Sequence, residues 1–173
     1  QYNGGGSGII SKCKIRYNYE GIDYGNYNVD SCIITHNQFG MVISTRPSIS
    51  NSVIDSNFIG ILNGRYAGFS SNTGGTIHVS NCEINYNSIG VDDNAQTGSP
   101  GKSTIYDSQI NYNGTGILDY VPTYNTGNTI KRNYIENDSV GIILAGFPDT
   151  ILCNSICNNI SYGIKYLGQN NLN

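Results

Sequence analysis

The chain has 173 residues, a net charge of −3 and a charged fraction of only 12%, about half the usual share. It is long enough for one domain with a core, and 38% hydrophobic residues exclude a charged disordered tail. No basic cluster points to nucleic acid as a partner, and no apolar run is long enough to span a membrane. Frequent Ile, 22 Gly and 14 Tyr favour strands and turns over helices.

An isoleucine recurs along the chain and anchors an internal repeat of seven units: Ile15, Ile34, Ile54, Ile84, Ile110, Ile135 and Ile156. Three positions later stands an amide or acid: Asn18, Asn37, Asn57, Asn87, Asn113, Asp138 and Asn159. Six positions later, or seven in the last unit, stands a glycine: Gly21, Gly40, Gly60, Gly90, Gly116, Gly141 and Gly163. Successive anchors are 19 to 30 residues apart. This period is typical of solenoids of short strands, whose coils bury a core only when stacked.

Two further columns precede the anchor. An aliphatic residue precedes each anchor by five positions: Ile10, Val29, Ile49, Val79, Ile105, Ile130 and Ile151. A small or amide residue precedes it by two: Cys13, Cys32, Ser52, Cys82, Ser108, Asn133 and Asn154. We expect the aliphatic columns to stack inside the solenoid. We expect the Asn column to form the bends, in left-handed backbone and bonded from coil to coil, and the Gly column to need backbone angles that other residues avoid.

The pattern N-x-x-I-x-x-N-x-x-G-I, seen as "NSVIDSNFIGI" (51–61) and "DSQINYNGTGI" (107–117), resembles the right-handed parallel β-helix repeat. Pectate-lyase-like enzymes, alginate epimerases and phage tailspikes share this repeat. The resemblance covers the chain from about Ile10 to Ile164. It implies an all-β fold, a single-stranded right-handed parallel β-helix of about seven coils that fills residues 1–173 as one domain. It is specific for fold and unspecific for activity.

Three long connections, 62–76, 92–103 and 119–129, leave from the same place in successive units. We expect them to project as neighbouring loops from one edge, where function concentrates on a rigid scaffold. These loops and their bases contain most of the candidate site residues: Arg65, Tyr66, Asp92, Asp93, Lys102, Asp119, Tyr120 and Tyr124.

Asp93 and Asp119 occupy the same column on adjacent coils, with Asp92 beside them. Stacked carboxylates repel, so a Ca²⁺ ion could bind Asp92, Asp93 and Asp119, or one carboxylate could take a raised pKa and act as an acid. Asp93, Asp119 and Arg65 are therefore the candidate catalytic residues. The family resemblance gives only loose support to a catalytic site at these residues, because two motifs of β-helix glycosidases, a His between glycines and Arg-x-Lys, are absent from the sequence. The alternative is that Asp92 and Asp93 end a strand and begin a solvated turn.

Tyrosines two positions after the anchor, Tyr86 and Tyr112 among them, form a column predicted to face solvent. Exposed Tyr rings can stack on sugar rings, although Tyr is also an ordinary exposed strand residue. The candidate carbohydrate-binding residues are Tyr66, Tyr86, Tyr112, Tyr120, Tyr124 and Lys102. His36 and His78 are isolated from any nucleophile or carboxylate, so we expect no catalytic role for them.

The five cysteines cannot all pair internally. Cys13, Cys32 and Cys82 belong to the small column, and we expect them to be free thiols packed as small hydrophobes. Cys153 and Cys157 are predicted to face outward.

No amphipathic helix stands before Ile10 or within "LGQNNLN" to cap the solenoid. The chain is therefore either an excerpt of a longer solenoid, or its ends pair with other copies. Our leading hypothesis is a non-catalytic, fibre-forming β-helix of the extracellular space or a cell or virion surface, with possible binding of a polysaccharide. The alternative is a lyase, C5-epimerase or glycoside hydrolase acting on uronate polysaccharides. We expect no cofactor, apart from a Ca²⁺ ion that could bind at the aspartates.

Overall fold

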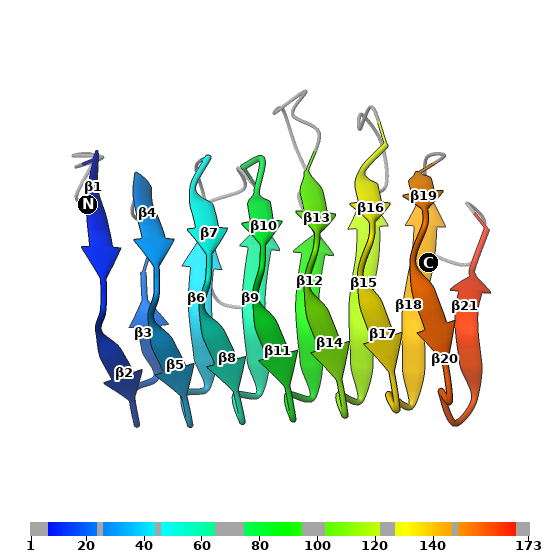
Figure 1. Cartoon of the computed structure of the whole chain (residues 1–173), viewed down its shortest axis with the longest axis horizontal. Coiled ribbons are helices and arrows are strands. Elements are labelled where there is room, and N and C mark those ends of the chain that lie inside the picture. The colour runs from blue at the N-terminus through cyan, green and yellow to red at the C-terminus, as the bar shows by residue number, and fades with distance from the viewer. Residues whose placement is uncertain are drawn as a thin grey trace.

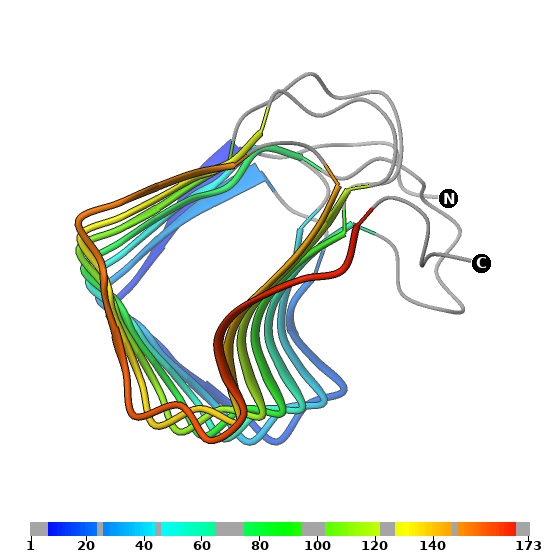
Figure 2. The ribbon, with the colours of Figure 1, turned by 90° about the vertical axis from the view of Figure 1, so that its right-hand side faces the viewer.

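The computed structural model describes residues 7–23, 26–43, 46–64, 75–94, 103–121, 127–146 and 149–168. These residues form 21 strands in three parallel sheets of seven strands, named sheets A, B and C. Successive strands enter the three sheets in turn, so three strands make one coil (Figure 1). Figure 2 shows the three-sided cross-section along the axis. The fold is all-β and consistent with a triangular parallel β-helix of about seven coils, as the sequence predicts.

Sheet A contains β1 (Ser7–Ser11), β4 (Asn26–Asp30), β7 (Ser48–Ser50), β10 (His78–Ser80), β13 (Thr104–Tyr106), β16 (Thr129–Lys131) and β19 (Thr150–Leu152). Sheet B contains β2 (Lys14–Arg16), β5 (Ile33–Thr35), β8 (Val53–Asp55), β11 (Glu83–Asn85), β14 (Gln109–Asn111), β17 (Tyr134–Glu136) and β20 (Ser155–Cys157). Sheet C contains β3 (Glu20–Ile22), β6 (Phe39–Ile43), β9 (Ile59–Gly64), β12 (Ile89–Asn94), β15 (Thr115–Val121), β18 (Val140–Gly146) and β21 (Tyr162–Tyr166). We call the three bends of a coil the A–B, B–C and C–A corners.

The register of the sheets follows the sequence repeat. Ile84 pairs with Ile54 on one side and Ile110 on the other, and all three side chains are fully buried. The other aliphatic columns join them in one core cluster that runs through the coils. The prediction that equivalent residues lie over each other is confirmed. A second buried cluster, of Phe39, Val42, Ile59 and Leu62, is formed by residues of sheet C that are not part of this core.

Buried polar ladders satisfy the backbone at the corners, where the strand hydrogen bonds are interrupted. Oδ1 of Asn57 accepts from the backbone N–H of Asn37 at 2.9 Å, and Oδ1 of Asn87 accepts from the N–H of Asn57 at 2.9 Å. At the A–B corner Ser108 Oγ accepts from the N–H of Cys82 at 3.2 Å in the same way. We call each of these bonds from a backbone N–H to a ladder side chain a rung. In every rung the N–H donor belongs to the earlier coil and the side-chain acceptor to the later coil, so the rungs have a direction.

The left-handed backbone lies one residue earlier than predicted. The described non-glycine residues with positive φ immediately precede the two ladder columns, and the Asn column itself has none. At the B–C corner they are Tyr17, His36, Ser56, Tyr86, Tyr112, Asn137 and Asn158. The sequence interpretation was wrong here because a buried Asn must turn its amide along the ladder, which leaves the preceding exposed residue to make the bend.

The Gly column requires glycine because successive coils leave no space for a Cβ atom, and not because of its backbone angles. Its members have no positive φ, but a Cβ on Gly60 would lie 2.6 Å from the carbonyl oxygen of Gly90 in the next coil. A Cβ on Gly40 would lie 2.5 Å from the oxygen of Gly60. The predicted unusual backbone angle is therefore wrong, and the close approach of successive coils is what selects glycine.

The five cysteines are free thiols, as predicted for Cys13, Cys32 and Cys82. Cys32 and Cys82 are buried in the small column, whereas Cys13 in the first coil is exposed, together with Cys153 and Cys157 in the last. Among the described residues there is no helix long and apolar enough to cross a membrane.

Candidate functional site

The long connections begin at the C–A corner, and their first residues still belong to sheet C. The middle parts of 62–76, 92–103 and 119–129 lie outside the described residues, so the expected projection of these loops stays a prediction. Residues 62–64 continue β9, 92–94 continue β12 and 119–121 continue β15. Asp93 pairs with Asn63 on one side and Asp119 on the other, so these three residues form one column at the strand ends. They alternate with outward residues and point into the solenoid.

Amide groups bind these interior carboxylates. Nδ2 of Asn128, just before β16, donates to Asp93 Oδ2 at 2.9 Å and to Asp119 Oδ2 at 2.6 Å. Nδ2 of Asn63 donates to the other oxygen of Asp93 at 2.7 Å. The Ser103 hydroxyl also bonds Asp93, and Asp149 shares a hydrogen bond with Asp119. The result is a closed polar network inside the C–A corner.

Burial shapes the ionisation of this network. Asp93 is 2% exposed and Asp119 is 4% exposed. Burial raises the pKa of Asp93 to about 6, although the hydrogen bonds from Ser103, Asn63 and Asn128 lower it in part. Burial, followed by the charges of Asp93 and Asp149, raises the pKa of Asp119 to about 8. A proton held between Asp119 and Asp149 is the arrangement expected where like charges crowd a buried site.

Asp92 points to the other face of sheet C, because it is adjacent to Asp93 in the strand. It is 6% exposed, and its Oδ1 has no hydrogen-bond partner. Burial, and then the charge of Asp93, raises its pKa to about 7. The interpretation of Asp92 and Asp93 as a solvated turn is therefore wrong: both are buried strand residues. The strand continues because the coil at this level pairs fully with its neighbours on both sides.

The described residues contain no group of three or more His, Cys, Asp or Glu side chains arranged to hold a metal ion. Asp92 lies on the opposite face of the strand from Asp93 and Asp119, which divides the predicted Ca²⁺ ligands between two faces. As it stands, the network can exchange protons and bind coils together, but its carboxylates offer almost no surface to a polymer.

Several predicted site residues fall outside the described part of the chain, namely Arg65, Tyr66, Lys102 and Tyr124. Tyr120 is in β15, but its side chain is likewise not described. The structure adds Asn63 and Asn128, which the sequence interpretation missed. Asn63 could have been found, because it stands in the Asp93 column one repeat earlier.

The exposed tyrosines occupy a different corner. Tyr86 and Tyr112 lie at the B–C corner, both more than half exposed. Their rings stack with centroids 5.1 Å apart and planes inclined by only 5°. The rings of Tyr17 and His36 contact each other in the same column, with centroids 5.4 Å apart and planes tilted by 51°. These two predicted carbohydrate-binding residues thus lie at a different corner from the carboxylates of the C–A corner.

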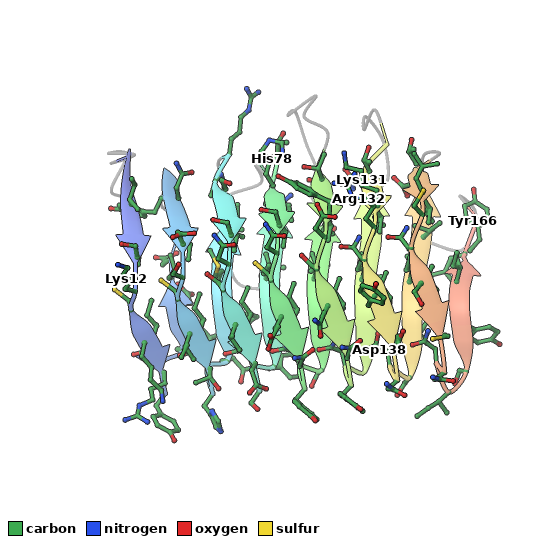
Figure 3. The ribbon with its side chains drawn as sticks, in the orientation of Figure 1. Lys12, His78, Lys131, Arg132, Asp138 and Tyr166 are labelled. Carbon is green, nitrogen blue, oxygen red and sulfur yellow. The ribbon has the colours of Figure 1, made fainter. Side chains whose placement is uncertain are left out.

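A shallow depression lies at the A–B corner of the last two coils, lined by Arg132, Asn133, Tyr134, Cys153, Asn154 and Ser155. The Arg132 guanidinium is held by both oxygens of Asp107 at 2.7 Å, so its charge is already paired. Figure 3 shows Arg132 on this side, next to Lys131.

Comparison with family models, with characterised proteins and with solved structures gives no match. The functional argument therefore depends on the geometry of this chain alone.

Proposed function

We propose that the chain is a non-catalytic structural module, a right-handed parallel β-helix of the pectate-lyase-like type, which associates end to end with further copies at an extracellular, cell or virion surface. The observation that carries this proposal is the complementarity of its first and last coils.

Both end coils expose residues that are buried elsewhere in the same columns. Ile164 in the last coil is 47% exposed, whereas Ile142, its partner in the preceding coil, is fully buried. In the first coil Ile15 is only half-buried, whereas Ile34 beside it is fully buried. A further coil on either end would cover this apolar surface, which favours association.

The polar ladders also end on complementary groups. The backbone N–H of Asn159, in the last coil, donates no hydrogen bond to any described residue. Oδ1 of Asn18, in the first coil, accepts none from the described residues. Because every rung has its donor in the earlier coil, Asn159 of one copy could donate to Asn18 of the next. The ladder would then continue across the junction.

The columns of the two ends match in charge as well. If a second copy continues the register, Lys165 meets Asp23, and Ile164 meets Ile22. Burial, followed by the charge of Asp23 and a hydrogen bond with it, raises the pKa of Glu20 to about 7, so a cation beside Asp23 would relieve the repulsion between these two acids. Lys165 Nζ lies 5.3 Å from the centroid of the Tyr162 ring. Lys165 belongs to β21 of sheet C, and Asp23, its proposed partner in the next copy, directly follows β3 of the same sheet. Figure 3 shows the two ends far apart, with Lys12 at one and Tyr166 at the other, so one copy cannot satisfy both.

The buried network at the C–A corner supports a structural role over the enzymatic alternative. A general acid or nucleophile must reach the substrate atom it acts on. Asp93 and Asp119 face the interior, and their oxygens are bonded to amide groups. Their pKa values are raised by burial, which explains the perturbation without a catalytic function.

The test is a charge exchange across the proposed junction. We expect the wild-type chain to form unbranched rods in electron microscopy that grow by about 34 Å per copy, from seven coils of about 4.8 Å. Lys165→Asp and Asp23→Lys should each abolish the rods, and the double variant should restore them. Lys131→Asp, the same charge change away from both end coils, is the control and should leave them intact. Monomers at all concentrations in sedimentation velocity, or failure of the double variant to restore association while folded, would contradict the proposal.

A second candidate function, glycan binding, is favoured by the exposed tyrosines of the B–C corner. Tyr86 and Tyr112 offer an apolar ring edge and a hydroxyl together, which suits sugars. We propose this binding as an addition to the structural role, at a corner that end-to-end association leaves uncovered.

A further inference from the structure

The aromatic column of the B–C corner is interrupted at one coil. Tyr17 and His36 form a tilted ring contact in the first two coils, and Tyr86 and Tyr112 stack in the fourth and fifth. The third coil has Ser56 in this position, with the same left-handed backbone, φ 55°, as Tyr86 and Tyr112, φ 56° and 57°. The backbone therefore keeps its shape through the gap, and only the ring is missing.

The gap has room for one ring. Neighbouring coils are about 4.8 Å apart, so the column positions of His36 and Tyr86 are separated by about 10 Å. A ring between them would lie about 5 Å from each. This distance falls within the range of about 4.5–7 Å over which aromatic rings interact favourably. It is also wider than the closest contact of two flat aromatic rings requires, which favours a thicker, saturated ring.

Hydrogen-bonding groups lie at the base of the gap. The Ser56 hydroxyl donates to Oδ1 of Asp55 at 2.9 Å. The other oxygen of Asp55 accepts no hydrogen bond from the described residues, and it is available to a ligand hydroxyl. His36 Nδ1 is engaged by the Thr35 hydroxyl at 2.7 Å, so Nε2 is the ring nitrogen left to face outward. Phe58, 42% exposed, follows two residues after Ser56.

We propose that this gap, the Ser56 slot, binds one neutral pyranose ring of a glycan between His36 and Tyr86. The two rings contact the faces of the sugar, and the Asp55 carboxylate accepts a sugar hydroxyl in a charge-assisted hydrogen bond. The same carboxylate repels uronates, which makes neutral hexose chains the preferred class. This inference rests on the proposed glycan binding by the exposed tyrosines, but it does not depend on end-to-end association.

The test uses neutral and charged hexasaccharides, namely cellohexaose, maltohexaose and hexagalacturonate. Binding is followed by nuclear magnetic resonance shifts of the ring protons of Tyr86 and His36 and by calorimetry. We expect at least one neutral chain to shift both rings and hexagalacturonate to shift neither. Ser56→Tyr supplies the missing ring and should weaken binding at least about tenfold, as should Tyr86→Ala, which removes one face. Tyr134→Ala removes an equally exposed ring from sheet B and should leave binding unchanged.

The outcomes separate the two proposals. If the neutral chain binds as well to Ser56→Tyr as to the wild type, while Tyr112→Ala weakens binding, the tyrosine surface binds glycans and the slot is refuted. If no hexasaccharide shifts any ring, both proposals are refuted. Tighter binding of hexagalacturonate than of the neutral chains would overturn the assignment of the ligand class. Ser56→Tyr should fold normally, because Tyr occupies the same column in three other coils, and circular dichroism checks this.

Discussion

Asp138 provides the most direct test of the ladder mechanism, because it is the one acid in the Asn column of the B–C corner (Figure 3). Its Oδ1 accepts from the backbone N–H of Asn113 at 2.6 Å, as an Asn oxygen would. Its Oδ2 is buried without a hydrogen-bond partner. In other coils the equivalent atom is the Nδ2 of an asparagine, which donates to a backbone carbonyl oxygen of the preceding coil. Asn57 donates in this way to Ile34 at 3.1 Å, and Asn87 donates to Ile54 at 3.1 Å. The equivalent carbonyl for Asp138 is that of Ile110.

The magnitude follows from the pKa of this carboxyl group. Burial raises the pKa of Asp138 from 3.8 to about 7, against the lowering effect of the Asn113 hydrogen bonds. The folded state therefore holds the proton more tightly than the unfolded chain. The associated stability is fully present below pH 4 and is lost as the pH rises through 7. Three pKa units correspond to at most about 4 kcal/mol, and an unpaired buried polar atom costs about 1–3 kcal/mol.

We therefore expect Asp138→Asn to increase the free energy of unfolding by about 2–3 kcal/mol at pH 8. It should have little effect at pH 4, where the aspartate is already neutral. Urea unfolding followed by circular dichroism at both pH values measures this difference. Asn57→Asp is the matched control, because it places a buried carboxyl group without an amide donor between Asn37 and Asn87. It should destabilise the protein chiefly at pH 8. An Asp138→Asn protein that is no more stable than the wild type at pH 8 would refute the ladder mechanism.

Two further predictions concern other columns. Gly60→Ala should reduce the free energy of unfolding by about 2–3 kcal/mol, because its Cβ would overlap the Gly90 oxygen. Gly163→Ala, in the last coil, meets no carbonyl and should cost far less in the same urea unfolding assay. Asp119→Asn should flatten the fall in stability between pH 5 and pH 8, because the raised pKa of Asp119 makes the wild-type network lose stability as its proton leaves; an unchanged pH profile would show that Asp119 does not hold that proton.

The sequence repeat was enough to predict the fold, because a solenoid uses each column for one purpose in every coil. Ile54, Ile84 and Ile110 could be aligned by spacing alone, and the structure stacks them. The reasons for individual columns were harder to derive. Spacing does not reveal how closely two coils approach at Gly60, nor which residue at a bend takes the left-handed backbone.

The candidate site was less predictable for a related reason. Alignment of the columns correctly placed Asp93 beside Asp119. Which face of the sheet the two side chains point to depends on whether the strand extends as far as these residues, because side chains alternate between faces only within a strand. Treating residues 92–103 as a loop ended the strand too early and made a buried pair look solvated. The amide donors were missed because Asn128 reaches the pair from sheet A, across the corner.

The direction of the ladders constrains how copies could assemble. In each rung the backbone N–H donor belongs to the earlier coil and the side-chain acceptor to the later one, so at the ladder columns the first coil offers a side-chain acceptor and the last coil offers a backbone donor. Two first coils facing each other would oppose acceptor to acceptor and reverse the strand direction. The proposed association is therefore heterologous, with the first coil of one copy on the last coil of another. Since the seven coils advance along a straight axis (Figure 1), repeating this contact does not close into a ring, and a heterologous contact that does not close produces a filament.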